Sequence, residues 1–297
     1  MKVVEKVCVF GGNGFIGRAV VSELADKGFE VTVCDRKISS RSTGAKYYYE
    51  CDLFDVDSIN KITKQVDYVF NFAAISDLDK CIDAPYESAN VNIMGNINLL
   101  LASAKAGVKR FIYASSLYAL GDSGGFYGCS KRASELYVEE FNKQMSLPYT
   151  IINYGSIFGV GSGPENTIYR LIDAALELGR VQYTGDNISS REYIDVVDAA
   201  SASVAALDLK YENRRLIVVG EQTILKQDFS RLIAEILSMR FDFNDVAVPE
   251  TKHYSKTPVR YDLDSSIRFK AENSRDIASS LHRTIEYVVK QRAEVQP

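Results

Sequence analysis

The chain is poor in the residues that build metal sites and disulfides. Its 297 residues include two histidines, His253 and His282, and five cysteines, none of which form a CxxC pair. These spacings assemble no metal-ligand cluster, so we predict that the protein binds no metal. An odd number of unpaired cysteines is typical of a reducing compartment and favours a cytoplasmic protein. Cys8, Cys34 and Cys51 stand in or beside short apolar segments, where we expect them to be buried.

Long apolar segments and a dominant positive charge are missing as well. No stretch approaches the roughly 18 apolar residues of a membrane span, and charges interrupt the first six residues. The formal net charge is -4, which provides no global positive field of the kind that nucleic-acid binders use. We therefore expect a soluble globular protein with no membrane and no nucleic-acid partner.

The first half of the chain alternates short apolar segments of strand type with amphipathic segments of helical period. The expected strands are Val7–Phe10, Val31–Cys34, Tyr47–Tyr49, Tyr68–Phe72, Phe111–Ala114 and Thr150–Asn153, and the expected helices are Phe15–Lys27, Val56–Thr63, Tyr86–Ala106 and Phe126–Met145. Such alternation is typical of a parallel sheet covered on both faces. We predict an α/β protein with a doubly wound, parallel-sheet Rossmann domain over residues 1–160.

The alternation breaks after Gly159, where a glycine-rich segment opens a mixed region. We predict a smaller, mixed α/β substrate-binding domain over residues 161–297, with some of its segments returning to the main sheet. No repeat, low-complexity linker or charge block separates the two parts, so we expect them to pack tightly.

Glycines follow the first expected strand at fixed spacing. Gly11, Gly14 and Gly17 lie between the strand Val7–Phe10 and the helix that begins at Phe15. Glycines there permit a tight turn, a close approach of backbone N–H groups to a pyrophosphate, and close packing of helix on strand. The second strand ends in Asp35, eighteen residues beyond Gly17. A carboxylate at this place accepts hydrogen bonds from ribose hydroxyls and repels a 2′-phosphate, which favours NAD over NADP, although the guanidinium of Arg36 favours the phosphate.

A second pattern indicates acid–base chemistry. Tyr127 and Lys131 have the i, i+4 spacing that places both side chains on one face of a helix. We expect the lysine to lower the pKa of the tyrosine, which would make Tyr127 a general acid/base. The strand Phe111–Ala114 ends in Ser115-Ser116, at the carboxyl edge of the sheet where such folds bind ligands. A serine hydroxyl there can hold the reacting hydroxyl beside the tyrosine.

Together these residues resemble the extended short-chain dehydrogenase/reductase family, specifically its NAD-dependent epimerase/dehydratase group, which acts on nucleotide sugars. The resemblance also includes Asp52-Leu53, Asn71–Ala74 and the helix from Asn92 to Leu100. It implies Ser116, Tyr127 and Lys131 as catalytic residues. It implies a cofactor site of Gly11, Gly14, Phe15, Ile16, Gly17, Asp35, Asp52, Leu53, Phe72, Ala73, Ala74, Asn92, Tyr127 and Lys131.

In the second half of the chain, the resemblance extends to the residues that bind the substrate. Asn166 stands where relatives contact the diphosphate or sugar, and the segment Arg191–Asp198 resembles one whose arginine holds the diphosphate. Ser156 completes the implied substrate site, in a segment that departs from the asparagine of many relatives, so the nucleotide is left open among UDP, GDP and CDP. The eleven-residue separation of Ser116 from Tyr127 is short for the family and implies a more open sugar pocket.

The main functional hypothesis is an NAD-dependent nucleotide-sugar epimerase, which oxidises its substrate to a keto-sugar and reduces it again. Dehydratases and decarboxylases of the family carry acidic residues just after the catalytic serine or threonine, whereas Leu117-Tyr118 follow Ser116 here. A keto-sugar reductase or dehydrogenase with net redox stays open, and a cofactor-sensing regulatory protein is the third alternative.

The resemblance also implies a homodimer that pairs through the helices Tyr86–Ala106 and Phe126–Met145. We expect apolar side chains of these helices to supply the contact, namely Leu99, Leu100, Leu136, Val138 and Phe141.

Overall fold

Alternate residues of the central strands point to opposite faces of one large sheet. In strand β1 (Lys6–Phe10), Val7 and Val9 belong to one hydrophobic core and Cys8 and Phe10 to the other. Both faces are therefore apolar, as a sheet covered on two sides requires. This computed structural model describes residues 4–38, 44–246, 253, 255–256, 266–270 and 274–295.

The large sheet has eight strands, all parallel, in the order β13-β10-β6-β5-β4-β1-β2-β3. Besides β1 its strands are β2 (Glu30–Asp35), β3 (Tyr47–Glu50), β4 (Tyr68–Asn71), β5 (Arg110–Ser116), β6 (Tyr149–Tyr154), β10 (Arg214–Val218) and β13 (Ser266–Arg268). All six predicted strands are present, and the doubly wound order confirms the predicted fold. The direction of winding reverses between β1 and β4, where ligands bind in such sheets.

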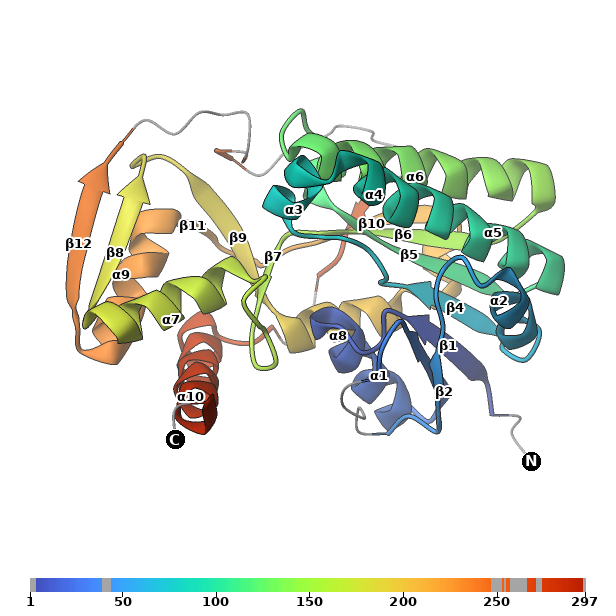
Figure 1. Cartoon of the computed structure of the whole chain (residues 1–297), viewed down its shortest axis with the longest axis horizontal. Coiled ribbons are helices and arrows are strands. Elements are labelled where there is room, and N and C mark those ends of the chain that lie inside the picture. Colours follow the sequence, from blue (N-terminus) through green and yellow to red (C-terminus); the bar gives the residue numbers. More distant parts are fainter. Residues whose placement is uncertain are drawn as a thin grey trace.

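Helices cover both faces of this sheet (Figure 1). One face carries α1 (Phe15–Asp26) and α8 (Val196–Ala205), which contact each other, and the other carries α2 (Val56–Thr63), α5 (Gly95–Ala106) and α6 (Gly125–Met145). Helix α8 and strands β10 and β13 come from the second half of the chain, which thus contributes to both parts of the molecule. The domain boundary at residue 160 stays a prediction.

The predicted helix Tyr86–Ala106 is divided into three segments. These are α4 (Pro85–Ala89), a π-helical turn (Asn90–Met94) and α5, and a short helix α3 (Leu78–Asp83) that we did not predict precedes them. The wider π turn brings the amide of Asn92 onto the backbone of Ile75, with which it forms two hydrogen bonds of 2.8 and 2.9 Å. Two further short 3-10 helices lie at Leu117–Ala119 and Leu209–Tyr211.

The prediction that five apolar side chains of α5 and α6 form an exposed surface is largely wrong. Leu99, Leu100 and Val138 are fully buried against the sheet, and Phe141 is partly buried. Leu136 is the member of the predicted set that is exposed. The three buried residues are needed for the core of the sheet's own face.

The second lobe packs around a separate core. It contains a three-stranded sheet, β11-β9-β7, and a two-stranded sheet, β12-β8, beside three helices (Figure 1). The elements are β7 (Ser156–Phe158), α7 (Thr167–Leu178), β8 (Arg180–Gly185), β9 (Ser190–Asp195), β11 (Thr223–Leu225), α9 (Lys226–Leu237), β12 (Arg240–Asp245) and α10 (Ile277–Val295). Parallel and antiparallel pairs both occur, so the smaller unit is mixed as predicted.

Within the described ranges, no helix combines the length and the apolar character that a membrane crossing requires.

Candidate active site

The turn after β1 is closely packed against its neighbours. Gly11 has a φ of +74°, and a Cβ atom at this position would lie 2.5 Å from the backbone nitrogen of Ala73. A Cβ atom at Gly17 would lie 2.2 Å from the carbonyl oxygen of Gly11. Both positions therefore require glycine, the first for its backbone conformation and the second for the contact of α1 with the turn. The prediction that these glycines allow close packing is confirmed.

A cavity of about 200 Å³ opens beside this turn. Of the predicted cofactor residues, eight line it: Gly11, Gly14, Asp35, Asp52, Leu53, Phe72, Ala73 and Ala74. Asp35 lies at the end of β2, where its carboxylate accepts hydrogen bonds from the backbone N–H groups of Asn13 (3.0 Å) and Arg36 (2.8 Å). The cavity thus combines backbone at the start of α1, a fixed carboxylate and apolar walls. Together these fit the pyrophosphate, the ribose and the adenine of a dinucleotide.

The other predicted cofactor residues do not line this cavity. Phe15, Ile16 and Gly17 form the first turn of α1. Asn92 holds the backbone of Ile75, and it also donates a hydrogen bond to the Ser130 hydroxyl (2.9 Å). Asn92 therefore acts on the cavity through Ile75, which lines it.

Ser116, Tyr127 and Lys131 come together at the carboxyl edge of the sheet. Ser116 is the last residue of β5, and Tyr127 and Lys131 lie in the first two turns of α6. The Lys131 ammonium is buried, donates a hydrogen bond to the Ala114 carbonyl oxygen (2.7 Å) and lies 5.8 Å from the centroid of the Tyr127 ring. The structure thus brings the three predicted catalytic residues together.

The expected pKa of Tyr127 is wrong for this structure. Burial raises the pKa of the Tyr127 phenol to about 12, and a hydrogen bond with Ser116 only partly opposes this change. Burial lowers the pKa of the Lys131 ammonium to about 8, although the carboxylate of Glu135 acts in the opposite direction. Removal from water is thus the dominant effect on both groups, raising the pKa of the phenol and lowering that of the ammonium.

A second and larger cavity, of about 530 Å³, extends from Ser116 to the smaller lobe. It is lined by the three predicted substrate residues Ser156, Asn166 and Arg191. The amide of Asn166 caps α7, accepting from Ile168 N (2.9 Å), and also donates to the Ile157 carbonyl oxygen (2.8 Å). Adjacent residues of the loop after β4 border both cavities, since Ile75 lines the smaller one and Ser76 the larger.

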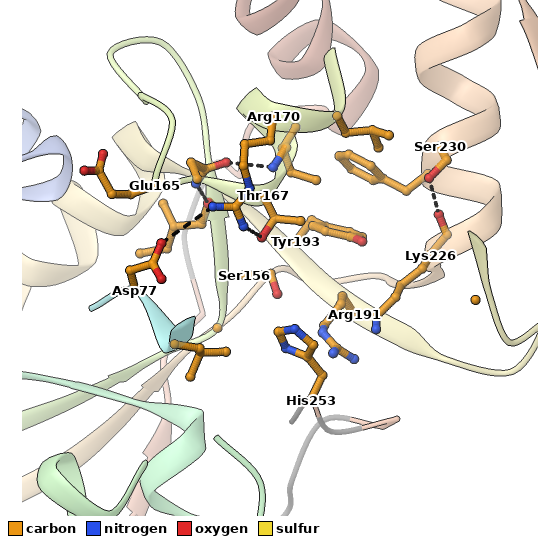
Figure 2. Close-up of a pocket in the computed structure, with 18 of the residues that line it drawn as sticks. Asp77, Ser156, Glu165, Thr167, Arg170, Arg191, Tyr193, Lys226, Ser230 and His253 are labelled. Atoms are coloured by element: carbon orange, nitrogen blue, oxygen red, sulfur yellow. Dashed lines mark hydrogen bonds and ion pairs between the residues drawn. The ribbon is translucent and has the colours of Figure 1, made fainter. Parts of the chain in front are cut away.

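Two titratable residues of the larger cavity, Lys226 and His253, were not predicted. Figure 2 shows the side chains of Arg191, Lys226 and His253 pointing to the same part of the cavity. Burial and the neighbouring Arg191 lower the pKa of Lys226 to about 8, with Asp186 acting against them. His253 Nδ1 lies 2.8 Å from the hydroxyl of Tyr118, whose ring packs edge-on against Tyr127. A lone lysine at a helix start and a lone histidine carry no spacing signal, so the sequence did not single them out.

Comparisons with known proteins agree with this geometry. The profile of the NAD dependent epimerase/dehydratase family matches residues 7–220. A UDP-N-acetyl-alpha-D-glucosaminuronate decarboxylase of Bacillus cytotoxicus is 30% identical over 249 residues, which cover 74% of this chain and 76% of the relative. The UDP-glucose 4-epimerase uge1 of Schizosaccharomyces pombe is 28% identical over 249 residues, covering 68% and 70% of the two chains. The crystal structure of the Thermotoga maritima UDP-glucose 4-epimerase with UDP-glucose superposes with a TM-score of 0.79 at 26% identity, over 97% and 99% of the two chains.

The chain belongs to the NAD-dependent epimerase/dehydratase family, of the extended short-chain dehydrogenase/reductase type. It is accordingly an enzyme, and its cofactor is NAD.

Proposed function

We propose that this enzyme epimerises a UDP-sugar by transient oxidation to a keto-sugar and reduction of the same carbon. The observation that carries the proposal is the larger cavity. Ser116, beside Tyr127 and Lys131, lines the same space as Arg191 and Lys226. A nucleotide sugar has the matching arrangement, because it carries a neutral sugar on one side of an anionic diphosphate. The relatives and solved structures that act on or bind UDP-sugars favour UDP over GDP and CDP.

The chain's own residues would act on one sugar hydroxyl. Tyr127 takes the proton of that hydroxyl during oxidation and returns it after reduction, while Ser116 holds the oxygen by a hydrogen bond. Bound NAD supplies hydride acceptance and return. Its binding residues are those of the smaller cavity. Since burial raises the pKa of Tyr127, the buried positive charge of Lys131 is needed to favour the phenolate.

Loss of water or of carbon dioxide is less well supported than epimerisation. The 30% identical relative is a decarboxylase. However, the two residues after Ser116 are Leu117 and Tyr118, and Leu117 is buried. Tyr118 lines the cavity and is hydrogen bonded to His253, and neither Leu117 nor Tyr118 is a carboxylate. An elimination would need an additional acid and base there.

The test is incubation of the purified enzyme with UDP-, GDP- and CDP-sugars, first without added cofactor. We expect catalytic interconversion of two UDP-sugar epimers without formation of stoichiometric NADH. NMR of the anomeric protons monitors the sugars, and absorbance at the reduced nicotinamide band monitors NADH. One equivalent of NADH formed or consumed per sugar would instead establish a dehydrogenase or reductase. Release of carbon dioxide from a UDP-uronate would establish a decarboxylase.

We further propose a homodimer through α5 and α6. Its support is a set of exposed apolar side chains on and before these helices, among which Leu136 is 63% exposed and Met94 49%. Sedimentation at micromolar concentration should show a dimer that Leu136→Glu dissociates. Leu209→Glu is the control, because Leu209 is 80% exposed but lies between α8 and β10. A wild-type monomer would refute this assembly. The predicted cytoplasmic location also stays a proposal.

A further inference from the structure

A buried carboxylate lies one helical turn beyond Lys131. Glu135 follows Lys131 at i+4 on α6, and 3% of its surface is exposed. Its Oε1 atom accepts a hydrogen bond from the Ser115 hydroxyl (2.5 Å) and another from the Asn153 amide (2.6 Å). Burial of an ionised carboxylate is costly unless it is hydrogen bonded and paired, and these two donors satisfy one oxygen.

The same carboxylate connects β5, which carries Ser116, with the neighbouring strand β6. The Asn153 amide also donates to the Ser116 carbonyl oxygen (3.0 Å), and Lys131 donates to Ala114 in the same strand. Glu135 therefore fixes the relative positions of β5, β6 and α6 directly behind Ser116 and Lys131.

An arginine from β10 balances this carboxylate. Arg215 forms an ion pair with the second oxygen of Glu135 and another, at 3.0 Å, with Glu139. The Arg215 side chain is 14% exposed, whereas that of Glu139 is 32% exposed. The order of charges running away from the site is therefore Lys131, Glu135, Arg215 and Glu139, with alternating sign.

We propose that Glu135 and Arg215 are positioning residues that act on the catalytic step in opposite electrostatic directions, Glu135 holding the Lys131 ammonium charged beside Tyr127 and Arg215 limiting that effect. The inference rests on the proposed role of Lys131, and neither residue touches the substrate cavity.

Lys131 has few other charged neighbours. The groups that face it are the Tyr113 ring from β5 (4.9 Å from Nζ to the centroid), Tyr127 on its own helix and the Cys81 thiol of α3. Burial raises the pKa values of the Tyr113 phenol and of the Cys81 thiol, so neither group supplies a negative charge at physiological pH. Glu135 is thus the main group that opposes the fall in the pKa of Lys131.

The experiment compares the alkaline limb of activity in three variants. In the wild type, Lys131 loses its proton as the pH rises through its pKa of about 8, and activity should fall with it. Glu135→Gln removes the stabilising carboxylate and should move this limb to lower pH by about one pH unit. Arg215→Met removes a cation and should move it to higher pH. Glu139→Gln, at the outer end of the network, is the matched control and should move it little.

Shifts of the alkaline limb in opposite directions in Glu135→Gln and Arg215→Met support the proposal. If both residues had a purely structural role, both variants would lose maximal activity but the midpoints of their alkaline limbs would coincide. Shifts of the same sign, or no shift in a folded variant, would overturn it. The pKa of Lys131 is also measured directly, by NMR titration of protein labelled with ¹³C at lysine Cε, its signal assigned by loss in Lys131→Arg. This titration does not depend on turnover. If the wild type epimerised no sugar, the proposed function would be refuted, but the titration would still test the effect of Glu135 and Arg215 on Lys131.

Discussion

The strongest single test of the nucleotide site is removal of the negative charge of Asp35. Asp35→Asn preserves the size of the side chain and removes its charge. Because Asp35 ends β2 and lines the smaller cavity, its carboxylate is placed to bind the adenosine ribose of NAD. We expect the wild type to bind NAD more tightly than NADP, and we expect the Asp35→Asn substitution to reduce that difference.

The magnitude follows from Coulomb's law. One negative charge of a 2′-phosphate about 5 Å from the carboxylate is repelled by about 3 kcal/mol at an effective dielectric constant of about 20, and by about 1 kcal/mol in bulk water. Asp35 is partly buried, so the wild-type preference should lie between these limits, or about 10- to 100-fold in Kd. Exposed Arg36 beside it attracts the phosphate and keeps the preference below the upper limit.

The assay is isothermal titration of wild type and variant with both dinucleotides at one fixed salt concentration. Asp35→Asn should raise the affinity for NADP and weaken that for NAD, since the carboxylate also accepts ribose hydrogen bonds. Arg36→Gln is the control and should weaken NADP binding alone. Equal NAD and NADP affinities in the wild type, or an unchanged ratio in Asp35→Asn, would refute the assignment of Asp35 to the ribose.

Three further changes test the rest of the site. Tyr127→Phe should lower kcat by about 10²- to 10⁴-fold while the variant still binds NAD, whereas a small loss would exclude Tyr127 as the acid/base. Lys226→Met should weaken the binding of UDP by about 10-fold and that of uridine little, as measured by direct titration. The reason is that the proposed contact of Lys226 is with the diphosphate, which uridine lacks. Gly17→Ala should destabilise the protein by about 1–3 kcal/mol, seen as a lower Tm, since its Cβ would lie 2.2 Å from Gly11 O.

The sequence predicted the main sheet well because its signals are local. Each of the six expected strands is a short apolar segment, and the glycines after β1 have a steric requirement that their spacing alone reveals. The helix division at Asn90–Met94 could not be predicted in the same way. The helical spacing of apolar residues continues through the predicted helix Tyr86–Ala106 without a break. The π turn is instead stabilised by the hydrogen bonds of Asn92 with Ile75, which lies outside that helix.

Burial and charge were predicted less well, because they depend on neighbours that the sequence does not identify. Leu99, Leu100 and Val138 are apolar residues on helices, and the pattern does not distinguish a core face from a dimer face. The spacing of Tyr127 and Lys131 predicts their proximity, and the expected effect on the pKa of Tyr127 assumed that attraction exceeds desolvation. Burial of the phenol instead raises its pKa.

The site also combines residues that lie far apart in the chain, and motifs reveal only those that lie close together in sequence. Ser116, Tyr127 and Lys131 lie within sixteen residues of one another, so a strand end and a helix start suffice to indicate them. Lys226, His253 and Arg215 come from the second half of the chain, where α9 carries Lys226 and β10 carries Arg215. The proposed reacting groups are thus encoded locally, whereas the cationic side chains of the larger cavity and the partner of the buried carboxylate are brought there by the tertiary fold. Variants at Lys226 and Arg215 therefore test the fold's contribution to function separately from that of the catalytic motif.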